Sequence, residues 1–316
     1  MSSSPEPRRH FAGRGLVVAG LLSAGIGYAL TTDYPALEVA GPMQSVGAVA
    51  LCTLMLFTGR SPFRRYSAVM WWLIARLAAG NAIVAVVYPF AVQGLTLGTV
   101  AAVVVIGYLS VDLAAIWRLR ATAWGLKHLC GRALVLGGVI MLNWPLQGGS
   151  ESLGMLCAVI SALCVWNTID VLGRMKKHGL EDQGAAIANL LAAPVLFLPV
   201  SVRHGSGWMS WDLFTTAGLA GLLTLFLPVL LINAALRRSA KGDVAMMQSL
   251  SSPVHALVAQ VGAGMGWLPS KQGLALGDWA AILLIAGSAV GVSSLKEPPG
   301  GVPGDRTRHR GNARRR

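Results

Sequence analysis

Charged residues are scarce in this chain of 316 residues, and acidic residues are the scarcest. Asp and Glu number 13, and charged residues make up 12% of the sequence, against roughly 25% in an average soluble domain. Hydrophobic residues make up 54%, and the mean hydropathy is +0.60. This composition excludes an ordinary soluble protein and predicts an all-α integral membrane protein.

The sequence also lacks the common catalytic and metal-binding motifs. It contains no HExxH, DxxxD, GxSxG or Walker motif, so nothing indicates a catalytic residue, a cofactor or direct use of ATP. Its cysteines lie inside apolar segments without CxxC spacing: Cys52, Cys130, Cys157 and Cys164. We therefore predict no disulfide framework, no metal site and no enzymatic activity.

Apolar runs long enough to cross a bilayer recur along the chain. We count ten, some of them short: 15–31, 42–59, 67–89, 96–117, 124–144, 152–172, 183–202, 213–236, 243–267 and 278–295.

The basic residues come in small groups between these runs, which is typical of cytoplasmic loops and not of a nucleic-acid-binding surface. They occupy alternate connections and both termini, and only four of the 26 lie elsewhere: Arg76, Arg132, Arg203 and Lys271. The positive-inside rule then predicts a multi-pass protein with both termini cytoplasmic, and we expect the membrane to be the cell membrane, a bacterial cytoplasmic membrane.

The chain divides into four parts on this basis. Residues 1–14 form a cytoplasmic N-terminal segment, 15–145 a first five-helix repeat and 152–295 a second. The Pro-, Gly- and Arg-rich residues 296–316 form a disordered basic tail. Because each repeat has five helices, the second must be inverted relative to the first.

Polar residues interrupt the run 243–267 near its centre: Gln248, Ser251, Ser252 and His255, with Pro253 among them. Such groups are costly in hydrocarbon and normally face a bundle interior or a water-filled cavity. The sequence therefore predicts that this segment lines a substrate pathway. His255 is the one histidine that we place deep in a helix, and it is a candidate for proton coupling.

Two stretches carry a weak internal repeat, LTLGTVAAVVVIGYLSVDLAA and SAKGDVAMMQSLSSPVHALVA. With LCAVISALCVWNTIDVLGRMKK and the junction ALRRSAKGDVAMMQSLSSPVHALVA, they resemble the drug/metabolite transporter superfamily, EamA-like, and within it the threonine/homoserine exporter branch. The resemblance covers about 15–295. It implies two bundles of five helices around a central cavity, and export of a small metabolite.

The sequence departs from this family at the positions of its carboxylates. Val104 and Tyr108 stand where the exporter branch tends to have Glu and Pro, and Ser252 stands where it has a Glu before proline. A different substrate, or coupling through other residues, would explain the difference.

Two charges within the spans are candidates for coupling or gating, Arg76 and Asp112. They can form a structural ion pair or a gate, and Arg132 is an alternative partner for Asp112. Asp170 is four residues before Arg174, a spacing typical of an ordinary helical ion pair.

Further site candidates are Tyr108, Trp166 and Asn167, because aromatic walls with few hydrogen-bonding groups suit a small amphiphilic ligand. Small residues recurring every four positions, at Ala19, Ser23 and Gly27, predict close helix packing. The GxxxG at Gly287 and Gly291 serves either internal packing or a homodimer.

The leading hypothesis is a secondary transporter that exports an amino acid or amphiphilic compound by alternating access within the lipid bilayer. Proton exchange is one form of it, resting on Asp112 and His255. The alternatives are a membrane-embedded enzyme acting on a lipid-linked substrate, and a non-transporting scaffold.

Overall fold

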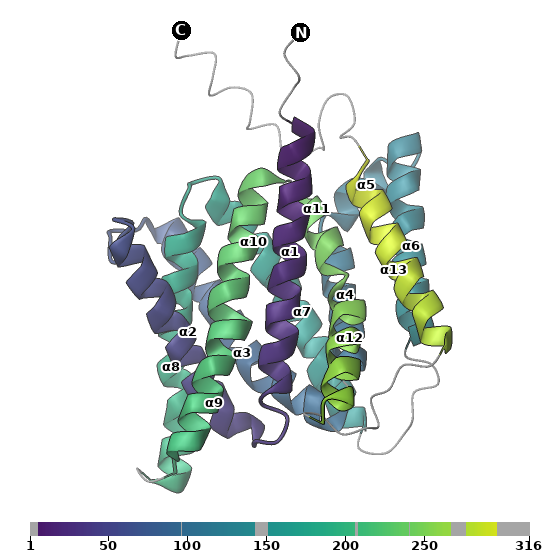
Figure 1. Cartoon of the computed structure of the whole chain (residues 1–316). Helices are drawn as coiled ribbons and strands as arrows, with labels where there is room; N and C mark the ends of the chain where they lie inside the picture. Colours follow the sequence, from purple (N-terminus) through teal and green to yellow (C-terminus); the bar gives the residue numbers. More distant parts are fainter. Residues whose placement is uncertain are drawn as a thin grey trace, which may run out of the picture.

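The computed structural model describes residues 6–95, 97–142, 151–205, 208–239, 241–266 and 276–295, and all regular structure in them is helical. Figure 1 shows the helices packed side by side in one bundle. Their bounds are α1 Glu6–Ala29, α2 Ala36–Phe57, α3 Ala68–Gly94, α4 Leu97–Ser110, α5 Leu113–Arg118, α6 Ala123–Leu142, α7 Glu151–Lys176, α8 Glu181–His204, α9 Trp211–Gly221, the π-helical turn η1 Leu222–Phe226, α10 Leu227–Arg238, α11 Lys241–Gln248, α12 Ser251–Gly264 and α13 Leu276–Ser293. The predicted tail 296–316 lies outside the described residues.

Seven of the described helices are long and apolar enough to cross a membrane: α1, α2, α3, α6, α7, α8 and the continuous helix formed by α9, η1 and α10. Large apolar side chains point outward from them, including Val202 at 83% exposure, Leu163 at 62% and Leu198 at 62%. A water-soluble protein rarely exposes so continuous an apolar surface. These helices therefore have the character of a multi-pass membrane protein, with lipid covering the exposed side chains.

The segment predicted as one helix over 96–117 is broken. α4 ends at Ser110, and Asp112 adopts φ +58°, a left-handed conformation that stops the helix before α5 begins. The carbonyl of Leu109 consequently loses its helical partner, and the Arg132 guanidinium of α6 donates to it instead. A cation at the C-terminal end of a helix also complements the helix dipole.

The segment predicted over 243–267 is broken as well, between α11 and α12. Pro253 lies in the first turn of α12, where its missing N–H is tolerated, but it cannot donate to the preceding turn. Ser249 and Leu250 form the break, and both side chains are buried. The two discontinuous helices lie against each other: α4 packs on α12 and on α11.

Helix packing follows a regular scheme when the helices are numbered by the predicted spans. Three contacts each have a counterpart. The contact of α3 with α7 corresponds to that of α1 with α10, and the contact of α3 with α8 corresponds to that of α2 with α9. The contact of α4 with α7 corresponds to that of α1 with α12. Three further contacts join helices that are themselves five spans apart, so the exchange leaves them unchanged: α2 with α8, α4 with α12 and α6 with α13. Each of these pairings is thus repeated when a helix is exchanged for the one five spans away.

Small residues make several of these contacts close. Ser23 of α1 donates to the carbonyl of Leu223 in η1 at 2.6 Å, which confirms that the predicted small-residue face packs on a neighbouring helix. A Cβ on Gly107 would collide with the carbonyl of Ala162 in α7. Gly287 and Gly291 behave differently, since an added Cβ at either would meet nothing within 4 Å. Neither glycine therefore serves close packing among the described helices.

The start of α1 and the end of α13 lie at the same end of the bundle (Figure 1), where Arg14 donates to the carbonyl of Ser293 at 2.7 Å. Ion pairs join α10 and the segment after α2 to the start of α8. Arg237 of α10 pairs with Glu181 and Asp182 at the start of α8, and Arg60 pairs with Asp182 at 3.5 Å. We call this the basic end of the bundle.

A neutral polar network ties together α2, α3 and α8. Asn189 accepts hydrogen bonds on Oδ1 from Gln44 at 2.7 Å and from Asn81 at 2.6 Å, and it donates to the carbonyl of Ala185. Each side chain has partners, so this network holds the helices together and is a poor candidate for a ligand site.

Candidate functional site

The polar run of α11 and α12 faces the interior of the bundle. Gln248, Ser251, Ser252 and His255 are all at most 4% exposed. Ser251 and Ser252 lie four and three residues before His255 in α12, so each neighbours the imidazole on the helix surface. The run packs between α1, α4 and α13, so both predicted halves of the chain surround it.

Four polar atoms of this run have no hydrogen-bond partner within the described part of the chain: Oε1 of Gln248, Oγ of Ser251, Oγ of Ser252 and Nε2 of His255. Leaving a buried polar atom without a partner costs about 1–3 kcal/mol. Four such atoms within eight residues of sequence therefore call for water or a bound solute. We call these four side chains the polar site.

His255 connects the polar site to the first half of the chain. Its Nδ1 lies 3.2 Å from the hydroxyl of Tyr88 in α3, and Tyr28 of α1 stacks on the Tyr88 ring with centroids 4.1 Å apart. Gly25 of α1 leaves room for the imidazole, since a Cβ there would lie 2.8 Å from its Cδ2. Tyr108 of α4 is buried in the same hydrophobic core. The site thus offers aromatic walls beside neutral hydrogen-bonding groups.

Charged residues form a second cluster nearer the basic end. The amine of Lys241 at the start of α11 lies 3.0 Å from Asp112 and 3.5 Å from Asp170 of α7. Arg76 of α3 donates to Asn167 at 2.6 Å and lies 4.0 Å from Asp170. We call these five side chains the charged cluster.

The pairing in this cluster differs from the expected one. Arg76 and Asp112 do not pair with each other among the described contacts. Asp112 forms an ion pair with Lys241, and Arg76 contacts Asn167 and Asp170 of α7. Lys241 lies between the predicted runs 213–236 and 243–267, and Asp112, which contacts it, stands at the break between α4 and α5. The predicted Asp170–Arg174 pair is confirmed at 2.8 Å.

Trp166 is separated from its predicted neighbours. It is 41% exposed on α7, whereas Asn167 turns inward and its Nδ2 donates to the carbonyl of Arg76 at 3.2 Å. Adjacent residues of a helix point about 100° apart, and here that offset places Asn167 toward α3 and Trp166 on an outer face. Asn167 therefore belongs to the charged cluster, and Trp166 lies outside both groups.

The sequence interpretation overlooked a buried histidine in α6. His128 is 6% exposed and Arg132 is 5% exposed, and Trp124 lies against the His128 ring with centroids 4.0 Å apart. His255 is therefore not the only buried histidine, although His128 lies in the second turn of α6. The four-residue spacing of Trp124, His128 and Arg132 would have revealed the shared face.

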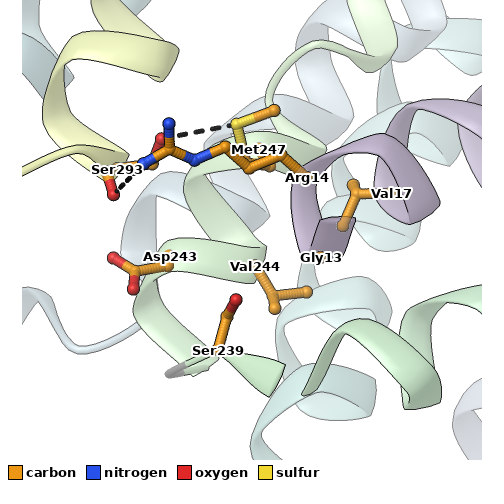
Figure 2. Close-up of a pocket in the computed structure, with 8 residues that line it drawn as sticks. All are labelled: Gly13, Arg14, Val17, Ser239, Asp243, Val244, Met247 and Ser293. Atoms are coloured by element: carbon orange, nitrogen blue, oxygen red, sulfur yellow. Dashed lines mark hydrogen bonds between the residues drawn. The ribbon is translucent and has the colours of Figure 1, made fainter. Parts of the chain in front are cut away.

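A small cavity of about 10 Å³ lies between α1, α11 and α13 at the basic end. Figure 2 shows Arg14 reaching across it to Ser293, whose hydroxyl contacts the sulfur of Met247. The space is about that of one water molecule. Met247 precedes Gln248 in α11, so the cavity and the start of the polar site lie on the same short helix.

Within the described residues, no group of three or more His, Cys, Asp and Glu side chains converges as a metal site would require. The chemistry that the two clusters offer is hydrogen bonding and ion pairing.

No family model and no curated protein match this sequence. Among solved structures, 24 chains match. One is a crystal structure of a protein that aligns with a TM-score of 0.66 at 16% identity, covering 92% of this chain and 97% of the other. A likeness at this identity establishes the shared fold alone, over nearly the full length of both chains.

Proposed function

We propose that this protein is a secondary transporter that moves a small polar or amphiphilic solute across the cell membrane by alternating access. The carrying observation is the polar site, where four buried polar atoms on a broken helix lack partners. Discontinuous helices with unsatisfied polar groups at membrane depth are typical of transporter binding sites. A solute passing between the halves would supply the missing hydrogen bonds.

The proposal includes two inverted five-helix repeats, 15–145 and 152–295. The exchange-symmetric packing of helices five spans apart supports this division. It also agrees with the resemblance to EamA-like drug/metabolite transporters and with cytoplasmic placement of the basic end and both termini. Export of an amino acid or amphiphilic compound remains the direction and substrate class that this resemblance favours.

The charged cluster serves as the gate at the basic end in this scheme. Lys241 belongs to the second repeat and Asp112 to the first, and Arg76 likewise reaches across to Asp170. Opening this end would separate both pairs, so their attraction stabilises the closed form. Asp112 is thus assigned to gating, which leaves His255 as the residue for proton coupling.

Two other functions compete with transport. An enzyme acting on a lipid-linked substrate would place carboxylates at the reacting group, but Asp112 and Asp170 are held by basic partners. A scaffold would have no use for unsatisfied polar atoms in its core. Direct measurement of flux separates all three.

The test is counterflow in proteoliposomes loaded with amino acids or with cationic amphiphiles, with and without a pH gradient. Ser252→Ala removes a hydroxyl of the polar site, and Ser161→Ala is its matched control, because Ser161 is equally buried but donates to the carbonyl of Cys157 in its own helix. We expect Ser252→Ala to raise KM about tenfold, the effect of one lost hydrogen bond, without lowering the melting temperature. If no solute moves under any gradient, the proposal is wrong.

A further inference from the structure

A second, larger cavity lies at the basic end, and no residue of the polar site or the charged cluster lines it. Its volume is about 200 Å³, several times the roughly 30 Å³ that one water molecule occupies in the liquid. It is bounded by the segment before α3, the first turns of α3 and the turn between α7 and α8. The lining residues are Arg64, Arg65, Tyr66, Ser67, Val69, Met70, Leu73, His178 and Leu180.

The lining of this cavity is divided by chemistry. Arg64, Arg65 and His178 supply basic side chains from the two connecting segments. Met70 and Leu73 are buried apolar side chains of α3, and they continue the cavity toward the membrane interior. The cavity therefore suits a ligand with an anionic head and an apolar body.

The electrostatic balance of the cavity is positive. Neither Arg64 nor Arg65 forms an ion pair within the described residues. The acids that follow Leu180 in the chain, Glu181 and Asp182, already pair with other arginines. α3 begins here with its N-terminal dipole directed at the same space, capped by the Ser67 hydroxyl, which accepts from the amide of Met70.

Aromatic side chains around the cavity mark the level of the membrane surface. Phe63, Trp71 and Trp72 are 61%, 47% and 65% exposed, and Trp71 meets the Tyr66 ring edge-on at 5.6 Å. Tryptophan and tyrosine gather at the headgroup level of a bilayer. A lipid headgroup can therefore enter this cavity sideways without leaving the membrane.

We propose that this cavity binds the phosphate headgroup of an anionic phospholipid. The arginines hold the phosphate, and the acyl chains leave along the exposed apolar side chains of α3, where Val69 is 65% exposed. A free phosphate ion would use only the basic rim and leave the apolar lining empty, which is why a lipid fits better than a soluble anion.

The experiment compares lipid retention by the purified full-length protein in micelles containing phosphatidylglycerol or phosphatidylcholine, measured by native mass spectrometry and by the shift in melting temperature. The cavity variant is Arg64→Gln with Arg65→Gln. Its control is Arg118→Gln with Arg120→Gln, which removes the same charge from exposed positions that do not line the cavity.

We expect the cavity variant to bind phosphatidylglycerol about tenfold more weakly or worse, the effect of losing two basic contacts to an anionic lipid, while the control variant keeps the affinity of the original protein. Equal loss in both variants, or no preference for phosphatidylglycerol over phosphatidylcholine, would overturn the proposal. Equal stabilisation by inorganic phosphate or glycerol 3-phosphate would also overturn it, because the apolar lining would then contribute nothing.

Discussion

Asp112→Asn should loosen the gate at the basic end. The substitution keeps the shape of the side chain and removes its charge, and asparagine tolerates the left-handed φ of +58° at this position. Lys241 would then lose its partner in the first half while keeping Asp170 in the second. Only the bond that crosses between the halves is removed.

The size of the effect follows from the exposure of the pair. Asp112 and Lys241 are 28% and 32% exposed, with 3.0 Å between carboxylate and amine. Fully exposed pairs contribute about 0–1 kcal/mol, and breaking a fully buried pair costs about 3–5 kcal/mol. An intermediate value of about 1.4 kcal/mol shifts the ratio of open to closed protein about tenfold.

Thiol labelling can measure that ratio. Ser251→Cys places a nearly isosteric thiol in the polar site, where Ser251 is 2% exposed, in a background whose native cysteines are replaced. A membrane-impermeant thiol reagent is then applied from the basic end in oriented vesicles. We expect Asp112→Asn to raise the labelling rate about tenfold, in proportion to the open population.

Arg174→Gln provides the control. Arg174 also binds Asp170, at 2.8 Å, but both residues belong to α7, so their separation is not required for opening. Its labelling rate should stay within about twofold of the reference, since an exposed helical pair contributes only about 0.3–0.5 kcal/mol. An unchanged rate in Asp112→Asn, or an equal rise in both variants, would refute the gate.

Three further predictions follow from single contacts. If His255 couples transport to protons, Tyr88→Phe, which removes the hydroxyl 3.2 Å from its Nδ1, should weaken flux driven by a pH gradient while leaving exchange flux intact; equal loss of both would assign it to substrate binding. Gly107→Ala should lower the melting temperature, by a destabilisation of about 1–3 kcal/mol from overpacking, whereas Gly137→Ala in α6, with nothing within 4 Å of the added Cβ, should leave it unchanged or raise it. The hydrogen bond from Tyr34 to a carboxylate of α9 raises the pKa of Tyr34 above its usual value near 10; this stabilisation is complete below pH 10 and is lost as the pH rises through the folded-state pKa, so Tyr34→Phe should flatten the fall in melting temperature above pH 10.

The fold class was predictable because the bilayer imposes a simple rule on sequence. In the bilayer, backbone polar groups must form their hydrogen bonds within the helix, and lipid-facing side chains must be apolar. The helices can therefore be recognised in the sequence as apolar runs. The burial of the polar site was predictable for the same reason. Gln248, Ser251, Ser252 and His255 are too costly to face lipid, and all four lie inside the bundle.

The breaks in the helices were harder to predict from the sequence. Pro253 lies just after the interruption between α11 and α12, within a segment predicted as one run, and no proline or glycine marks the interruption at Asp112, which adopts a left-handed conformation that hydropathy does not register. The position of that break decides where Asp112 points. Hydropathy alone therefore left the partner of Asp112 open, and the break is what places it beside Lys241.

By itself, the sequence determined which segments are helical and which residues are too polar to meet lipid, because both depend on the cost of each residue in hydrocarbon. Only the tertiary structure decided the partners. It directed Arg76 to Asn167 and Asp170, Asp112 to Lys241, and His255 to Tyr88. Arg76 and Asn167 are 91 residues apart in the sequence, and Tyr88 and His255 are 167 apart. Hydrophobic periodicity along one helix carries no information about which face of another helix lies opposite.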